Sequence, residues 1–149
     1  MRKTIFAGAV LALSAPAVLA AGDPVAVRKA TMQSVGAAAA VSGAMMKGEL
    51  AYSPAVGKAA IATMNAAALS FGAFFPEGSD LDGDTTAAPK IWEDMAGFEA
   101  TLAKFAEVTG AAAAAAGKDG PADLDAFKAA MGPVMASCKT CHETYRVQR

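Results

Sequence analysis

The sequence predicts an all-α protein that folds as an antiparallel up-down-up-down four-helix bundle. Three observations lead to this prediction. Four long segments begin with helix start signals, apolar residues recur along them at steps of three and four, and the connections between them are short. No segment has the alternating pattern of a convincing strand. A length of 149 residues is enough for one domain and too short for two ordinary ones.

The first two helices begin with the same signal, an N-cap residue followed by proline at the first helical position. Asp23-Pro24 opens a helix that runs to about residue 48, and Ser53-Pro54 opens a second helix that runs to about residue 71. A loop rich in Gly, Asp, Thr and Pro follows over residues 72–88. The short connection at 49–53 makes the two helices antiparallel neighbours.

The third helix is expected to begin near Pro89 and to end before Gly117, and the fourth to run from Pro121 towards Arg146. The apolar spacing predicts one buried stripe along each of these helices. The stripe residues are Ile91, Met95, Phe98, Leu102 and Phe105 in the third helix, and Leu124, Phe127, Met131, Val134, Cys138, Cys141 and Tyr145 in the fourth. Because Pro133 removes one backbone hydrogen bond, we expect a kink or a local break near it.

The first 20 residues have the features of a secretory signal peptide. Arg2 and Lys3 supply the positive start, an apolar stretch follows over 5–13, and small residues over 15–20 lead to a cleavage site after Ala20. This pattern predicts a signal peptide at 1–20, a mature domain at 21–149 and export to the periplasm. A short membrane anchor is the alternative, but the apolar stretch is too short to span a bilayer.

The charged residues are scattered, and their balance is mildly acidic. The formal net charge of −1 becomes about −3 once the two basic residues of the predicted signal peptide are removed. The sequence has no basic patch and no run of Lys or Arg, so we expect no nucleic acid partner.

A C-x-x-C-H motif at residues 138–142 is the part of the sequence that points to chemistry. On a helix, residues at i, i+3 and i+4 project from one face. Two thiols on that face can each add to a vinyl group of one haem. The histidine is then held beneath the iron, for which its ring nitrogen is a good ligand. The motif therefore predicts one covalent haem c, attached through Cys138 and Cys141, with His142 as an axial ligand.

Other interpretations of the cysteine pair explain less. A structural zinc site normally takes four protein ligands, whereas this chain has two cysteines and one histidine. A thioredoxin-like redox motif expects a βαβ pattern, which is absent from the sequence. A disulfide is the default for a cysteine pair in an exported protein. It leaves the position of His142, directly after the pair, unexplained.

The combination of a helical bundle and a C-x-x-C-H motif near the C-terminus resembles the class II cytochromes c, which comprise the cytochromes c′ and their low-spin relatives. The resemblance covers essentially the whole mature chain. The residues that carry it are Cys138, Cys141, His142, Glu143, Tyr145 and Arg146, together with Arg28, Met32, the stretch 74–78 and the stretch 89–92.

The resemblance implies a four-helix bundle with the haem inside it and the proximal histidine, here His142, on the last helix. It also implies that a side chain of the first helix covers the other haem face, and in this sequence that residue is Met32. Members of the family often form homodimers through their first two helices, so a homodimer is possible here.

Two arginines and two aromatic residues are also candidates for contact with the haem. Arg28 lies one turn before Met32, and Arg146 lies one turn after His142, so we expect both guanidinium groups near the haem propionates. Phe71 and Trp92 are assigned to the core, and Phe74 and Tyr145 are candidates for contact with the porphyrin. The methionines other than Met32 are assigned to packing.

Two functions remain open at this point. With Met32 as a second axial ligand, the iron has no open position, which suits electron transfer with redox protein partners. Without that ligand, the protein is a five-coordinate cytochrome c′ that binds nitric oxide or carbon monoxide, as the resemblance implies. Enzyme activity is not expected, because the only histidine is used as a ligand and none remains for distal acid–base chemistry.

Overall fold

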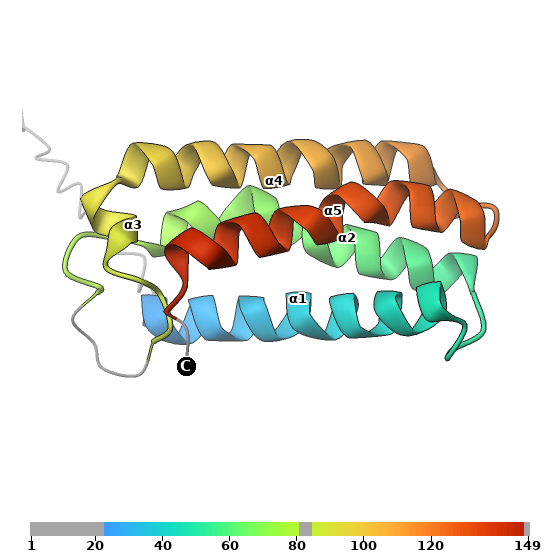
Figure 1. Ribbon diagram of the computed structural model, residues 1–149, viewed down its shortest axis with the longest axis horizontal. Coiled ribbons are helices and arrows are strands. Elements are labelled where there is room, and N and C mark those ends of the chain that lie inside the picture. Colours follow the sequence, from blue (N-terminus) through green and yellow to red (C-terminus); the bar gives the residue numbers. More distant parts are fainter. Residues whose placement is uncertain (1–22, 81–84, 148–149) are drawn as a thin grey trace, which may run out of the picture.

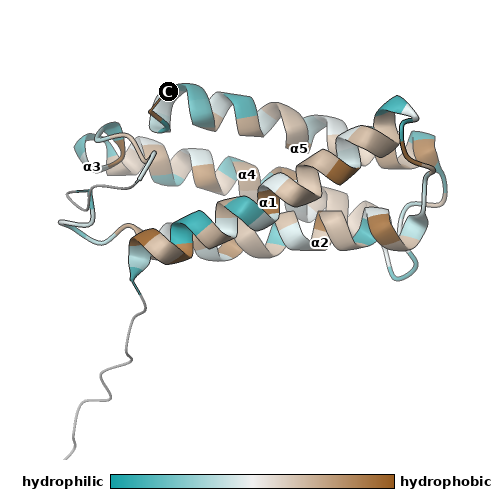
Figure 2. Ribbon diagram, turned by 90° about the horizontal axis from the view of Figure 1, so that it is seen from below, coloured by the Kyte–Doolittle hydropathy of each residue, from teal (hydrophilic) through white to brown (hydrophobic). Residues whose placement is uncertain are grey.

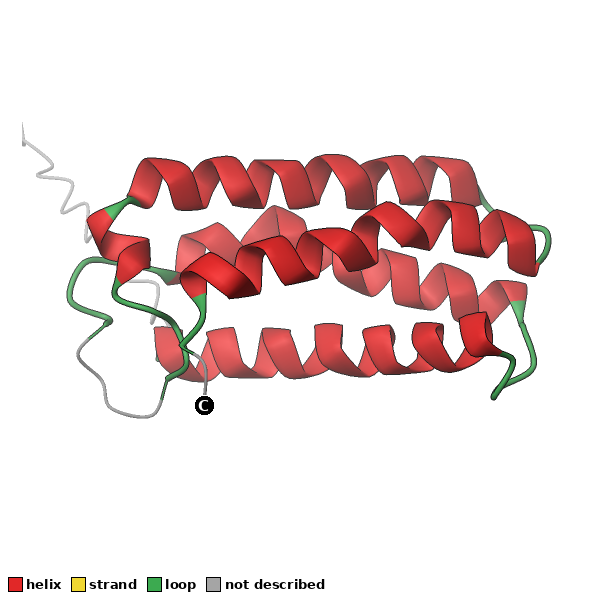
Figure 3. Cartoon of the chain, in the orientation of Figure 1, coloured by secondary structure: helices red, strands yellow, loops and turns green. Residues whose placement is uncertain are grey.

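The structure is a computed structural model that describes residues 23–80 and 85–147. The predicted signal peptide lies outside these residues. The described chain forms the expected four-helix bundle, with long helices α1 (Pro24–Lys47), α2 (Pro54–Ser70), α4 (Met95–Ala116) and α5 (Leu124–Tyr145) (Figure 1). A 3-10 turn, η1 (Phe71–Phe74), extends α2, and a one-turn helix, α3 (Lys90–Glu93), precedes α4. Figure 3 shows that loops join these helices at the two ends of the bundle.

The predicted start and end signals of the first helix are confirmed. The Asp23 side chain caps α1 by accepting a hydrogen bond of 2.9 Å from the backbone N–H of Val25. Gly48 ends α1 with a left-handed backbone of φ 79°, which glycine adopts without steric cost. Ser53 occupies the N-cap position of α2, but its side chain makes no capping hydrogen bond.

The predicted third helix is wrong in one respect, because Asp94 divides it into α3 and α4. Asp94 has a non-helical backbone with φ −140°, and its carboxylate accepts a hydrogen bond of 3.1 Å from the backbone N–H of Gly97. Asp94 therefore caps the following helix, α4, and does not continue the preceding one, α3.

The fourth helix begins three residues later than expected. The Asp123 carboxylate accepts a hydrogen bond of 2.8 Å from the backbone N–H of Ala126, so the cap lies after Pro121 and α5 starts at Leu124. The helix is assigned without interruption through Pro133, and the local break considered for that site does not occur.

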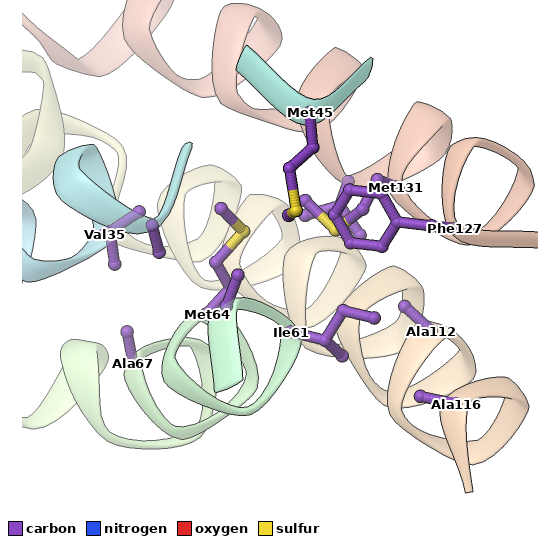
Figure 4. Packing of buried hydrophobic residues seen from close by; sticks show 12 residues of the cluster. Val35, Met45, Ile61, Met64, Ala67, Ala112, Ala116, Phe127 and Met131 are labelled. Atoms are coloured by element: carbon purple, nitrogen blue, oxygen red, sulfur yellow. The ribbon is translucent and has the colours of Figure 1, made fainter. Parts of the chain in front are cut away.

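Buried apolar residues form two clusters, one toward each end of the bundle. The first lies between the four long helices, where Met45, Met64, Phe127 and Met131 converge (Figure 4). The second is aromatic and consists of Phe71, Phe75, Ile91, Phe98 and Tyr145. Each long helix carries both hydrophobic and hydrophilic residues along its length (Figure 2).

The aromatic cluster lies at the end of the bundle where α3, the start of α1 and the end of α5 come together (Figure 1). Overall, α1 and α5 are packed less closely than the other pairs of neighbouring long helices, and a cavity lined by both lies beside the aromatic cluster. No helix among residues 23–80 and 85–147 is long and apolar enough to cross a membrane.

Candidate haem-binding site

The candidate site is a cavity of about 430 Å³ beside the aromatic cluster. Its walls come from α1, α4 and α5, with additional residues from η1, α3 and the segment 85–87. A volume of this size is within the range of pockets that hold small molecules and cofactors. Most of the lining side chains are apolar, which favours a hydrophobic ligand.

The C-x-x-C-H residues form one wall of this cavity. Cys138, Cys141 and His142 lie in the last two turns of α5, and their spacing of three and four residues places them on one helix face. All three side chains are half-buried, and the two thiols are free rather than joined in a disulfide. The cysteines are therefore available to bind a group that occupies the cavity.

The surroundings of these residues hold them in uncharged forms. Burial raises the pKa of the Cys138 thiol, and burial together with the neighbouring Cys138 raises the pKa of the Cys141 thiol. Burial also lowers the pKa of His142, and the positive charge of Arg146 lowers it further. An imidazole with a lowered pKa is neutral at neutral pH, which is the form that can ligate iron.

The wall formed by α1 carries Met32, Val35, Gly36 and Ala39. Met32 is half-buried and packs against both hydrophobic clusters. The structure thus brings Met32 and His142, which are 110 positions apart in the sequence, to two helices that line the same cavity. Gly36 and Ala39, which follow Met32 on this wall, are small, and a side-chain carbon built at Gly36 would meet no atom within 4 Å.

Both candidate arginines line the cavity, but in different settings. Arg28 is buried, with 4% of its surface exposed, and three of its guanidinium hydrogen bonds go to the segment 74–79. Arg146 is exposed and follows directly after α5. Its backbone forms an isolated antiparallel bridge with Ala87, another lining residue. The expected contact of either arginine with a propionate stays a prediction.

Several lining residues were not identified by the sequence pattern. Phe75 lines the cavity with 6% of its surface exposed, whereas Phe74, the expected candidate, does not line it. The rings of Phe75 and Phe98 pack edge to face with centroids 4.7 Å apart. Tyr145 lines the cavity as expected, and its ring packs against Phe98 at 5.3 Å.

The segment 85–87 contributes to the wall through its backbone pairing with the C-terminus. The backbone N–H of Val147 donates to the carbonyl of Thr86 at 2.9 Å, and that of Ala88 donates to the carbonyl of Tyr145 at 3.0 Å. This pairing joins the end of α5 to a loop that is distant in the sequence. No motif in the loop signals the contact.

The residues of the cavity fit a haem. Two free thiols on one face can form thioethers, a neutral imidazole on the same face can ligate iron, and the apolar walls suit a porphyrin. A methionine on the facing helix can supply a second axial ligand or cover the other face.

Comparisons with known proteins agree with this assignment. The family described as Cytochrome C' matches residues 23–146. Cytochrome c' from Rhodopseudomonas palustris is 38% identical over 149 residues, which span 100% of this chain and 98% of that protein. Cytochrome c-556 from Agrobacterium fabrum is 37% identical over 99% of this chain and 97% of that protein.

Solved structures have the same fold. Cytochrome c' from Rhodopseudomonas palustris superposes with a TM-score of 0.77 at 36% identity, over 85% of this chain and 98% of that chain. A cytochrome c' described as having a ligand-controlled dimer dissociation superposes with a TM-score of 0.75 at 28% identity, over 85% of this chain and 95% of that chain.

Proposed function

This chain belongs to the cytochrome c′ family, and we propose that it is an electron carrier whose haem iron has His142 and Met32 as its two axial ligands. The family binds one covalent c-type haem and its members are haem proteins rather than enzymes, so the cofactor of this chain is a single haem c. Cys138 and Cys141 are the residues that fit its attachment.

One observation carries the proposal: Met32 and His142 lie on facing helices and line the same cavity. A bound haem supplies an iron that changes between the ferric and ferrous states. With a nitrogen ligand on one side and a sulfur ligand on the other, no position would remain for an exchangeable ligand. A thioether also favours the reduced state, which suits an electron carrier.

The other residues of the site support the same role. Burial keeps the His142 imidazole neutral, so it can ligate without first losing a proton. The apolar walls, formed by residues such as Phe75, Phe98 and Leu102, limit the water near the cavity. The less water lies near the iron, the less solvent has to rearrange when the charge of the iron changes.

A second candidate function is the five-coordinate, gas-binding one, and the small residues near Met32 favour it. Gly36 leaves open space one turn after Met32, and Ala39 follows on the same wall. If the Met32 sulfur does not bond iron, this space can accommodate nitric oxide or carbon monoxide beside the thioether.

Optical spectra of the haem-loaded protein separate the two functions. We expect low-spin spectra with a sulfur-to-iron charge-transfer band in the wild type, and slow binding of carbon monoxide to the ferrous form. Met32→Leu keeps a side chain of similar size but removes the sulfur, and should give high-spin spectra and rapid carbon monoxide binding.

The matched control is Met64→Leu, which changes a fully buried methionine of the first cluster that does not line the cavity. This variant should keep the wild-type spectra. High-spin spectra and rapid carbon monoxide binding in the unmutated protein would contradict Met32 ligation and favour the gas-binding function.

We further propose that the chain is exported to the periplasm and exchanges electrons there with redox protein partners. The signal-like sequence of residues 1–20 supports export. The family includes dimers, so a homodimer of this chain is possible. Cell fractionation tests the location: covalent haem should appear in the periplasmic fraction and disappear from it when residues 1–20 are deleted.

A further inference from the structure

Arg28 is a buried cation whose hydrogen bonds join α1 to a distant turn. One terminal guanidinium nitrogen (Nη1) donates to the carbonyl of Phe74 at 3.2 Å and to the hydroxyl of Ser79 at 3.0 Å. The other (Nη2) donates to the carbonyl of Ser79 at 2.8 Å. These bonds span 46 and 51 residues of sequence, and only 4% of the arginine surface is exposed.

The same guanidinium packs against two aromatic rings. Its central carbon lies 4.8 Å from the centroid of the Phe75 ring and 5.5 Å from that of Trp92. Trp92 in turn donates from its indole N–H to the carbonyl of Pro76 at 3.2 Å. Arg28 is therefore enclosed by residues 74–79, which we call the 74–79 turn, and by Trp92 of α3.

The turn also makes internal hydrogen bonds, but these do not connect it to α1. The backbone N–H of Ser79 donates to the carbonyl of Pro76 at 3.2 Å, and the Ser79 hydroxyl donates to the same carbonyl at 2.8 Å. They set the shape of the turn, whereas the Arg28 bonds set its position against the helix. Phe75, the second residue of the turn, lines the cavity.

We propose that Arg28, one helical turn before Met32, is a positioning residue that fixes the 74–79 turn and Trp92 against α1, and thereby holds Phe75 in the wall of the cavity that Met32 also lines. The planar guanidinium suits this role because it offers five N–H donors in a fixed geometry, three of which serve the turn. An ammonium on a flexible stem cannot reproduce these three bonds and both ring contacts together.

The charge of Arg28 has a second effect on a bound haem. A positive charge held in the cavity wall, with little exposure to solvent, stabilises the reduced state over the oxidised state, because reduction lowers the positive charge at the iron. Position and charge are separable by mutation: Arg28→Lys keeps the charge and loses the geometry, whereas Arg28→Met loses both and keeps an apolar stem.

Amide hydrogen exchange of the haem-loaded protein tests the positioning role directly. The amide of Ser79 and the indole N–H of Trp92 both donate to the carbonyl of Pro76 in the turn. The bonds from Arg28 hold this turn in place, and hydrogen bonds from a charged donor are the stronger ones. Without them, both N–H groups should exchange about tenfold faster or more in Arg28→Lys and in Arg28→Met. Ser79→Ala removes one acceptor and should give a smaller acceleration at Trp92. Lys47→Met removes an exposed positive charge from the other end of α1 and should leave both rates at the wild-type value.

A second readout comes from the single tryptophan and from the reduction potential. Trp92, the only tryptophan of the chain, should change its near-ultraviolet circular dichroism in both arginine variants. The potential should fall in Arg28→Met and stay near the wild type in Arg28→Lys.

Wild-type exchange rates in Arg28→Lys would overturn the positioning role, and an unchanged potential in Arg28→Met would overturn the role of the charge. If Arg28→Met fails to fold, Arg28→Lys and Ser79→Ala still decide the first question. Neither exchange rate depends on whether the Met32 sulfur bonds iron, so failure here is distinguishable from failure of the proposed axial ligation.

Discussion

Replacing Phe127 by alanine should destabilise the bundle strongly without altering the haem environment. Phe127 is fully buried in the first hydrophobic cluster, and its ring packs against Tyr52 with centroids 5.5 Å apart. Two ring atoms lie 3.1 and 3.2 Å from the position where Gly57 would carry a side-chain carbon. The ring therefore fills the space beside a glycine of α2, which has no side chain that could move into the void.

The size of the effect follows from this geometry. Phe→Ala substitutions in cores cost about 3–5 kcal/mol, and the cost is greatest where the surroundings cannot collapse. Because Gly57 has no side chain to move into the void, we expect about 4 kcal/mol, the middle of that range. This is a large fraction of the ~5–15 kcal/mol that stabilises an ordinary domain.

Urea unfolding of the haem-loaded protein, followed by far-ultraviolet circular dichroism, measures the loss. Phe98→Ala is the matched control, because Phe98 is equally buried but lines the cavity and belongs to the aromatic cluster. Both variants should lose stability, but only Phe98→Ala should alter the haem absorption spectrum. A loss below about 1.5 kcal/mol for Phe127→Ala, or a changed spectrum in that variant, would refute the reasoning.

Three further predictions concern the cavity itself. The wild-type protein should retain its haem through acid–acetone extraction, because thioethers survive where coordination bonds do not, and the double variant Cys138→Ala, Cys141→Ala should lose it; free extraction of wild-type haem would refute covalent attachment. Tyr145→Phe removes only a hydroxyl, so it should change the urea midpoint modestly and leave covalent haem intact in a denaturing gel stained for haem; loss of that stain would show a larger role. Gly36→Leu places a side chain in open cavity space and should lower the amount of covalent haem per chain, whereas Gly43→Leu, also with open space but not on the cavity wall, should not; equal haem content in both would contradict the assigned wall.

The bundle and the thiol–imidazole face were predictable because they depend on local rules. Helix caps such as Asp23 and Gly48 act within a few residues, and the helical period alone places Cys138, Cys141 and His142 on one face. The C-x-x-C-H motif adds the chemistry, because it is the part of the sequence that predicts covalent haem attachment. These features required no knowledge of the tertiary packing.

The break at Asp94 was not predictable from the apolar pattern. Ile91, Met95 and Phe98 follow a helical spacing, but the first lies in α3 and the other two lie in α4. The apolar spacing continues across the break because these residues pack together, whereas the capping of the Gly97 N–H by Asp94 ends one helix and starts the next. Apolar periodicity predicts which residues are buried, but it does not predict that the helix breaks at a single residue.

The position of Phe75 in the cavity wall was not predicted, for a related reason. The chain leaves α2 through the 3-10 turn η1, which changes the angle between successive side chains from that of an α-helix.

The role of Arg28 was predictable only in part. Its place beside the cavity followed from its distance to Met32, but its bonds to Ser79 join residues 51 positions apart. Only the folded chain brings these residues together.

The bond between the Met32 sulfur and the iron is the central claim, and nuclear magnetic resonance of the ferrous protein tests it most directly. With carbon-13 in the methionine methyl groups, each methionine gives one signal; the full sequence contains eight, of which seven lie outside the predicted signal peptide. A methyl group held over the haem as an axial ligand is shifted far upfield by the ring current, outside the range of every other methionine. We predict one such signal in the wild type, absent in Met32→Leu and retained in Met64→Leu. A ferrous wild-type protein with no upfield methionine signal, or with signals broadened by a high-spin iron, would contradict the ligation and the electron-carrier function that rests on it.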